Sequence, residues 1–132
     1  MRQKGVTLIE LVIAMTIVAL LTAVAIPGYQ GFVQRSQRVE AKEALVHLAS
    51  NQERFYLQNN TYSADLDDLG FSEAETANGH YEMSVVEADQ QGFTLRATAA
   101  SASMSADEAC QEFELNEANE RSASPDTDGN CW

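Results

Sequence analysis

The chain is short of positive charge. It has eight lysines and arginines against twenty aspartates and glutamates, which gives a formal net charge of −12 over 132 residues. The imbalance is uneven, because residues 1–40 carry a net charge of +2 and residues 41–132 carry a net charge of −14. An acidic part of this kind repels phosphate backbones, which argues against direct nucleic-acid binding. We interpret its acidity as a solvated surface rather than a site for a specific cationic partner.

Histidine and cysteine are also scarce, with two of each. His47 and His80 stand apart from any serine, cysteine or aspartate set that would indicate nucleophilic catalysis. No phosphate-binding loop and no paired catalytic carboxylates are present in the sequence, and no histidine lies near either cysteine to complete a zinc ligand set. The sequence therefore predicts no enzyme, no cofactor and no metal site.

Two groups of acidic residues could suggest a cation site. Residues 65–68 hold three aspartates, for which capping and solvation are the simpler interpretation. Asp126, Asp128 and Asn130 loosely follow a calcium loop, but the glycine and the distant glutamate of an EF-hand are not in register. We interpret the second group as a turn.

Charge is absent from one long stretch near the N-terminus. Leu11 to Ile26 has no charged residue, and extension back to Leu8 gives nineteen residues. As a helix this segment would be about 28 Å long, close to the roughly 30 Å of bilayer hydrocarbon. Glu10 lies within it, and a carboxylate in hydrocarbon costs on the order of 2–3 kcal/mol. The segment predicts a membrane-spanning helix whose carboxylate has a function and needs a partner.

The N-terminal residues resemble the start of a type IV pilin precursor. A short basic leader ends at Gly5, Val6 stands where an aromatic residue is common, and Thr7-Leu8-Ile9-Glu10 leads into the apolar run and Ala25-Ile26-Pro27-Gly28-Tyr29-Gln30. The resemblance implies cleavage after Gly5 by a prepilin peptidase, N-methylation of Val6 and packing of the mature helix into a filament core. It divides the chain into a leader (1–5), a membrane or filament-core segment (6–28) and a head (29–132).

Two simpler interpretations of the apolar run compete with this one. An ordinary signal peptide would be cut near Ala23-Val24-Ala25, but Glu10 inside the run and the helical pattern beyond Pro27 argue against it. A plain single-pass anchor accounts for the hydrophobicity but not for Gly5 five residues before Glu10.

The remaining pattern predicts an α+β fold of the type IV pilin kind, with a long helical spine packed on a small antiparallel sheet of three to four strands. One helix is expected from about Thr7 to Gln58, kinked or loosened at Pro27-Gly28. Its second half has an apolar stripe, and Gln52 is assigned to the polar side. The expected stripe comprises Phe32, Val39, Leu45, Leu48, Ala49, Phe55 and Tyr56. Alternating residues predict strands at 80–87, 93–99 and 111–116, a fourth at 121–124, and a loop at 100–109.

Cys110 and Cys131 are both near the C-terminus. In an exported domain this small they predict one disulfide. The loop between them has about twenty residues, for which the chain-entropy estimate gives roughly 3 kcal/mol of stabilisation.

The later chain resembles minor pilins of the PilE type. The resemblance is carried by Gln52 to Tyr62, Asp68-Leu69-Gly70, Gly79-His80-Tyr81, Gly92 to Leu95 and Cys131-Trp132. It implies a low-copy subunit that initiates the pilus or sits near its tip, with twitching motility and adhesion downstream. The implied partners are major and minor pilins, the prepilin peptidase and methylase, and the inner-membrane assembly machinery. The implied location is the inner membrane, single-pass with the head in the periplasm, and then the surface pilus.

Other functions stay open at this point. A major pilin and a type II secretion pseudopilin are the nearest alternatives, and a membrane-anchored periplasmic binding module is the alternative of another class. In the pilin interpretation, Glu10 pairs with the N-terminal amine that cleavage creates at Val6 of an adjacent subunit. A contact within one chain stays open as well, because Val6 and Glu10 are four residues apart on one helical face.

Overall fold

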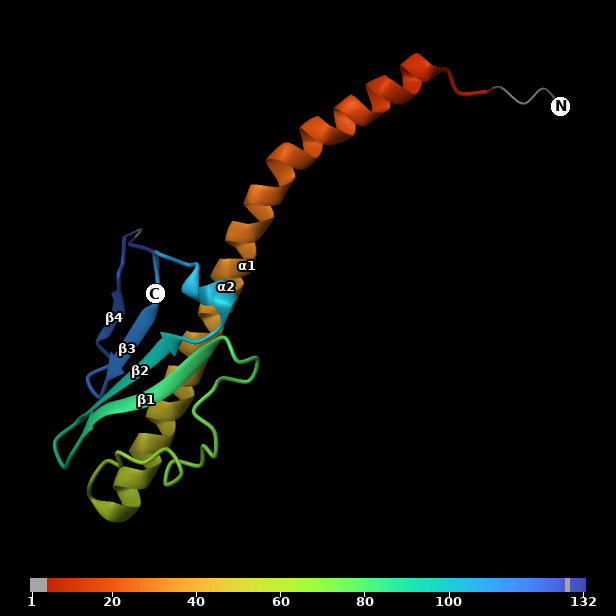
Figure 1. The fold of residues 1–132 in the computed structure, drawn as a ribbon. Helices are drawn as coiled ribbons and strands as arrows, with labels where there is room; N and C mark the ends of the chain where they lie inside the picture. The colour runs from red at the N-terminus through yellow and green to blue at the C-terminus, as the bar shows by residue number, and fades with distance from the viewer. Residues whose placement is uncertain (1–4, 128) are drawn as a thin grey trace. The chain divides into compact units, whose positions relative to one another are not determined.

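A computed structural model describes residues 5–127 and 129–132 (Figure 1). The elements follow the order α1 (Leu8–Asn59), β1 (Tyr81–Ala88), β2 (Phe93–Ala99), α2 (Ala102–Ser105), β3 (Glu112–Asn116) and β4 (Arg121–Ser124). The chain divides into two compact units, Met1–Val33 and Gln34–Trp132, and α1 contributes to both. The basic leader residues Arg2 and Lys4, and Asp128 of the proposed turn, lie outside the described residues.

The first unit is the N-terminal part of α1. The hydroxyl oxygen of Thr7 accepts a hydrogen bond from the backbone N–H of Glu10 at 3.4 Å, and the Thr7 carbonyl accepts one from Leu11 at 3.2 Å. The helix therefore starts with a threonine cap, and the spacing from Thr7 to Glu10 is that of a capping box. The hydroxyls of Thr16 and Thr22 donate to the carbonyls of Val12 and Val18, so these polar groups are satisfied within the helix.

The apolar side chains of this part of α1 are not covered by the described part of the chain. Between Leu8 and Ile26 the large apolar side chains are 52–83% exposed. Among the described residues, α1 is the one helix long and apolar enough to cross a membrane. The helix continues through Pro27-Gly28, and the predicted kink there stays a prediction.

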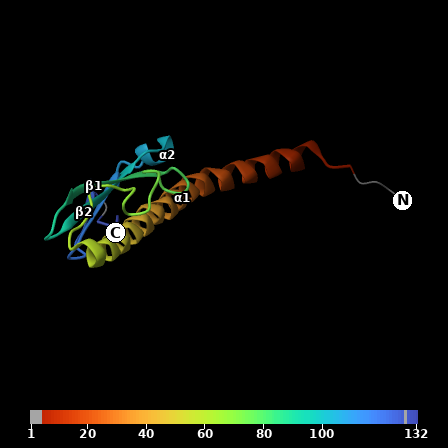
Figure 2. The ribbon, with the colours of Figure 1, turned by 90° about the horizontal axis from the view of Figure 1, so that it is seen from below.

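The second unit packs the C-terminal half of α1 against a four-stranded antiparallel sheet in the order β1-β2-β3-β4 (Figures 1 and 2). In the register, Tyr81 lies opposite Ala99, Leu95 opposite Leu115 and Phe113 opposite Ala123. Alternate residues of each central strand face the helix, which is the pattern of a sheet with one covered face. The buried strand residues are Tyr81, Met83, Phe93, Leu95, Ala97, Phe113 and Leu115.

The predicted strands are confirmed to within a residue or so at their ends, including the fourth, and so is the helix over its whole length. The predicted loop at 100–109 is wrong in part, because it contains α2. Ser101 caps this short helix by accepting from the backbone N–H of Met104 at 3.4 Å, and the Met104 side chain is fully buried. A cap and one buried side chain are enough to order a turn that periodicity cannot detect.

The face that α1 turns toward the sheet differs from the predicted stripe. Val39 is 45% exposed, and Gln52, expected on the polar side, is fully buried. The buried positions are spaced by three and four residues, as a single helical face requires. They are Arg38, Ala41, Leu45, Leu48 and Gln52.

Gln52 is buried because its amide is satisfied. Its Nε2 donates to the Ser63 carbonyl at 2.6 Å, and its Oε1 accepts from the Ser63 N–H at 2.9 Å. Ser63 in turn donates its hydroxyl to Asp68, and Asp65 accepts from the N–H of Asp67. Asp65 thus accepts from a backbone N–H of its own turn, Asp68 holds the Ser63 hydroxyl, and the Gln52–Ser63 bonds fasten the segment after α1 to the helix.

The predicted disulfide is present. Cys110 and Cys131 are 21 residues apart in sequence, their Cα atoms are 5.6 Å apart, and both are fully buried. The bond joins Cys110, two residues before β3, to Cys131 after β4. Trp132 follows, and its indole ring packs edge-on against Phe113 with centroids 5.7 Å apart.

We expect Cys131→Ser to lower the free energy of unfolding of the second unit by about 2–4 kcal/mol, because the variant frees a closed loop in the unfolded chain. Chemical denaturation of the full chain in detergent measures the change. The double variant Cys110→Ser/Cys131→Ser should lose the same amount, since it breaks the same bond. Wild-type protein that keeps its full stability after reduction would contradict this expectation.

Candidate functional site

The segment before α1 is open on all sides. Gly5 and Val6 are exposed and lie outside the helix. A Cβ atom built on Gly5 has no other atom within 4 Å. The Gly5–Val6 peptide bond is therefore accessible to an enzyme, and the surrounding fold places no demand on the side chain at Gly5.

Glu10 is the single charged residue within the first five turns of α1. Its side chain is exposed, and its carboxylate makes no hydrogen bond or ion pair with the residues that the structure describes. A carboxylate in the first helical turn interacts favourably with the helix dipole, which accounts for part of its stability there. The dipole does not supply a counter-ion, so in an apolar environment Glu10 still needs a positive partner.

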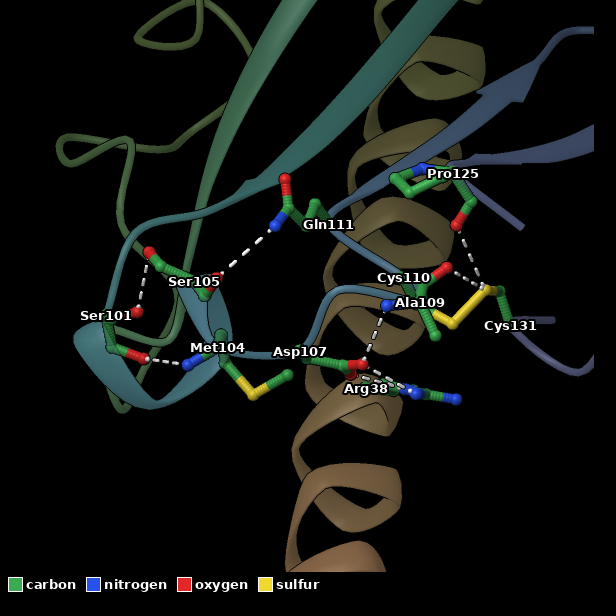
Figure 3. A network of polar contacts seen from close by, with 10 residues as sticks. All are labelled: Arg38, Ser101, Met104, Ser105, Asp107, Ala109, Cys110, Gln111, Pro125 and Cys131. Atoms are coloured by element: carbon green, nitrogen blue, oxygen red, sulfur yellow. Dashed lines mark hydrogen bonds and ion pairs between the residues drawn. A yellow bond between two sulfur atoms is a disulfide. The ribbon is translucent and has the colours of Figure 1, made fainter. Parts of the chain in front are cut away.

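An ion pair holds the segment between α2 and β3 against α1 (Figure 3). Arg38 donates from Nε and Nη2 to the two carboxylate oxygens of Asp107 at 2.7 and 2.8 Å, and both residues are buried. Asp107 also accepts from the N–H of Ala109, next to the disulfide at Cys110. The bidentate geometry fixes this loop and the disulfide behind it to the helix.

Tyr81 lies close to this pair in the core. Its hydroxyl is buried without a hydrogen-bond partner among the described residues. Burial and the nearby Asp107 raise the pKa of the phenol, so Tyr81 stays neutral at every physiological pH. Tyr81, Arg38 and Asp107 are all buried, and their arrangement is that of a structural core.

A second polar cluster joins α1 to the segment before β1. Glu40 accepts from Nδ1 of His80 at 2.8 Å and from the backbone and side-chain nitrogens of Asn78, both at 3.0 Å. Nε2 of His80 lies 2.8 Å from Nε2 of Gln37. Burial raises the pKa of Glu40, but hydrogen bonds from Thr76, Asn78 and His80 outweigh it and lower that pKa to about 2. Glu40 is therefore a charged clamp rather than a proton donor.

The depressed pKa of Glu40 predicts an acid-dependent loss of stability. In the unfolded chain Glu40 takes up its proton near pH 4.5, whereas in the folded chain it does so near pH 2. Its stabilising contribution is complete above pH 4.5 and disappears as the pH falls toward 2. We expect Glu40→Gln to be less stable than wild type at pH 6, with a difference that shrinks in this window.

Thermal melts between pH 2 and pH 6 test this expectation. Glu43→Gln is the matched control, because Glu43 is exposed on the same helix and makes no hydrogen bond or ion pair with a described residue. A difference between Glu40→Gln and wild type that is constant across the range would show that the charge of Glu40 is not what stabilises the fold.

The sequence identified part of this site. Cys110 and Cys131 are brought together as predicted, and Gly5, Val6 and Glu10 lie in one exposed segment. The sequence predicted no catalytic partners for His80, and in the structure its Nδ1 contacts the carboxylate of Glu40. The Arg38–Asp107 pair was missed. The feature of the sequence that could have indicated this pair is the position of Arg38, three residues before Ala41 on the buried face of α1. Within residues 5–127 and 129–132, no three metal-ligating side chains gather into a site.

Comparison with known families assigns the chain. The model of the type IV minor pilin ComP, DNA uptake sequence receptor, matches residues 27–114, and the model of the prokaryotic N-terminal methylation motif matches residues 1–26. This chain belongs to the ComP family of type IV minor pilins. The pilin is thus a structural subunit, and it has an N-terminal methylation motif, an apolar N-terminal helix and a C-terminal disulfide.

Individual proteins agree with this family. The pilin is 42% identical over 88 residues to the fimbrial protein EcpC of Eikenella corrodens, covering 64% of this chain and 54% of EcpC. It is 35% identical over 88 residues to the type IV major pilin protein PilA of Myxococcus xanthus, covering 67% of this chain and 40% of PilA. The pilin thus spans about half the length of these curated relatives.

The fold has a solved counterpart. The non-core minor pilin PilV of Neisseria meningitidis superposes with a TM-score of 0.56 at 24% identity, over 70% of this chain and 88% of PilV. At this identity the likeness concerns the fold alone. The expected α+β pilin fold, with its long helix on an antiparallel sheet and its C-terminal disulfide, is confirmed.

Proposed function

We propose that this pilin is a minor subunit of a type IV pilus that helps to start assembly or occupies the tip, and so supports twitching motility and adhesion. The observation that carries the proposal is the exposed apolar part of α1 with the single charge of Glu10, joined to a compact acidic unit. An apolar helix of this length is stable in a membrane or among similar helices, but not in water. The chain then resides in the inner membrane, with the acidic unit in the periplasm, until it enters the filament.

The first step in this proposal is processing. A prepilin peptidase cleaves between Gly5 and Val6, and the new amine of Val6 is methylated. The exposure of Gly5 and Val6 and the match to the methylation motif over residues 1–26 support this step.

The second step is insertion into the filament through Glu10. The amine of Val6 and the carboxylate of Glu10 are each costly in an apolar environment, and together they largely cancel. Val6 precedes α1, so the helix does not impose a contact between the two within one chain. We infer that the amine of one subunit pairs with Glu10 of its neighbour, which sets the register between helices that otherwise gain little from apolar contact.

The minor role is supported by the family model and has a specific competitor. The matching model describes a minor pilin, whereas the curated relative PilA of Myxococcus xanthus is a major pilin. Quantifying this chain in sheared, purified pili separates the two. A minor subunit is present in a much smaller amount than the main pilin. Deletion of its gene reduces the number of surface pili while the bulk pilin remains in the membrane. If this chain is instead the most abundant protein in purified pili, it is the major pilin.

The family model also names a DNA uptake sequence receptor. We propose that the head of this pilin does not bind DNA directly, because residues 41–132 carry eighteen acidic residues against Lys42, Arg54, Arg96 and Arg121. Of these four, Arg96 is neutralised by Glu114 at 2.7 Å. Non-specific binding rests on cations that contact phosphates, and here the net charge opposes them.

A binding assay checks this expectation. Fluorescence anisotropy with short duplexes, from a random pool and from genomic DNA of the source organism, should give no saturation at about 10 µM protein and physiological salt, which is within the usual range for non-specific binders. Bovine serum albumin serves as an acidic control protein, and a basic DNA-binding protein as the positive control. Saturable binding that weakens as salt rises would contradict the proposal.

A further inference from the structure

An open groove with apolar walls lies on the second unit, beside the C-terminal half of α1. It has a volume of about 470 Å³, and it is lined by Lys42, Glu43, Val46, His47 and Ser50 of α1, Arg121 at the start of β4, and Trp132. All of these residues belong to the compact unit Gln34–Trp132.

Two cations border this groove without an anionic partner. Neither Lys42 nor Arg121 makes an ion pair or a hydrogen bond to a carboxylate within the described part of the chain. Burial lowers the pKa of Lys42, and the neighbouring positive charges of Arg38 and Arg121 lower it further. Positive charges therefore repel one another here, in a unit that has acidic residues in large excess.

The other cations of residues 41–132 are placed differently. Arg96 is paired with Glu114 on the sheet. Arg54 donates to the side-chain oxygen of Asn51 and lines another pocket. The groove thus brings two cations that make no ion pair with a described residue together with an apolar surface and one carboxylate, that of Glu43. An apolar surface left open to water is typical of an interaction site.

The apolar wall of the groove is held in place. Trp132 packs edge-on against Phe113, and its Nε1 donates to the carbonyl of Ser122. The guanidinium of Arg121 lies over the Trp132 ring at 5.4 Å from its centroid, and Val46, which also lines the groove, is 50% exposed. A fixed indole costs little entropy on binding, which is typical of a recognition surface.

We propose that this groove binds a segment of a neighbouring pilin subunit that presents a carboxylate next to an apolar side chain. The carboxylate would lie between Lys42 and Arg121, and the apolar side chain would pack between Val46 and Trp132. Charge complementarity supports this occupant, because acidic heads placed side by side repel one another unless a cationic surface intervenes. The inference rests on the proposed function, since it needs the chain to be in a filament.

Charge reversal at the groove tests the proposal. The double variant Lys42→Glu/Arg121→Glu should be present in sheared pili at least about tenfold below wild type, because like charges facing each other across an interface cost several kcal/mol and each 1.4 kcal/mol is tenfold. Arg54→Glu is the matched control, as Arg54 is an exposed cation of α1 outside the groove. The control should enter pili like wild type.

Photo-crosslinking gives a readout that does not depend on charge reversal. The full chain with p-benzoylphenylalanine in place of Val46 is irradiated in assembled pili, and the cross-linked peptide is identified by mass spectrometry. The same residue in place of Leu57, which is 83% exposed and outside the groove, is the control. We expect a peptide of a neighbouring pilin head, with an aspartate or glutamate beside an apolar residue, from Val46 only.

The outcomes separate this inference from the proposed function. Wild-type chain that is absent from pili overturns both. Wild-type chain in pili, together with normal entry of the double variant or a Val46 cross-link to lipid or to a segment without carboxylates, overturns the groove and leaves the pilin function standing. If the double variant misfolds, as a thermal melt would show, the identity of the cross-linked peptide alone decides.

Discussion

A precursor that carries Gly5→Glu is expected to stay full length in the inner membrane. The substitution adds bulk and negative charge directly before the bond that the peptidase cuts. It has no effect on the fold, because Gly5 precedes α1 and a Cβ atom there meets no other atom within 4 Å. The loss of processing is therefore a loss of recognition, and uncleaved chain cannot present the amine of Val6 to a neighbouring Glu10. Surface pili should contain none of this variant.

Immunoblots of membrane and pilus fractions measure this result, because the precursor is heavier by the five leader residues. Gly5→Ala is the matched control: it adds one methyl group at the same open position and should still be cut. A Gly5→Glu chain that appears in pili at its mature size would mean that the cut lies elsewhere, as the signal-peptide interpretation near Ala25 requires.

The variant Glu10→Ala should be processed and membrane-resident, yet enter filaments poorly. The apolar run still inserts, and the cut site is unchanged. What is lost is the acceptor for the amine of the next subunit, which leaves an unpaired charge among apolar helices. Removing one partner of a buried pair costs about 3–5 kcal/mol in proteins, and 1.4 kcal/mol is already tenfold. We expect this variant in sheared pili at least about tenfold below wild type.

A second variant of Glu10 separates its charge from its place in the first turn of α1. Glu10 lies in the first turn of α1, where a carboxylate interacts favourably with the helix dipole, so Glu10→Ala also weakens the helix start. Glu10→Gln keeps the size and polarity of the side chain but removes the charge, and it should be as poorly assembled as Glu10→Ala. Glu10→Asp keeps the charge with a shorter reach and should fall between. Wild-type levels of Glu10→Gln in pili would show that the charge of Glu10 is not needed for assembly.

Periodicity in the sequence was sufficient for the main elements of this fold. The helix from Leu8 to Asn59 has an apolar first half and an amphipathic second half, and the strands alternate between buried and exposed residues. These are local patterns that burial on one face imposes. The disulfide was also predictable, because two cysteines in a small exported domain leave one pairing.

The polar interior was not predictable in this way. Arg38, Gln52 and Asp107 count as surface residues in any hydrophobic pattern, yet each is buried. Their burial is permitted by partners far away in sequence: Arg38 and Asp107 satisfy each other across 69 residues, and Gln52 is satisfied by Ser63. A hydrophobic pattern takes no account of polar side chains that are satisfied by distant partners. It therefore predicted Val39 on the buried face of α1 in place of Arg38 and Gln52.

The mass of the chain recovered from sheared, purified pili tests the central claim most directly. We expect a mature chain that begins at Val6, carries one N-methyl group and has Cys110 joined to Cys131. A chain that begins at Ile26, that keeps its leader, or that is absent from the pili of cells that express it would show that the protein is not a processed pilin subunit.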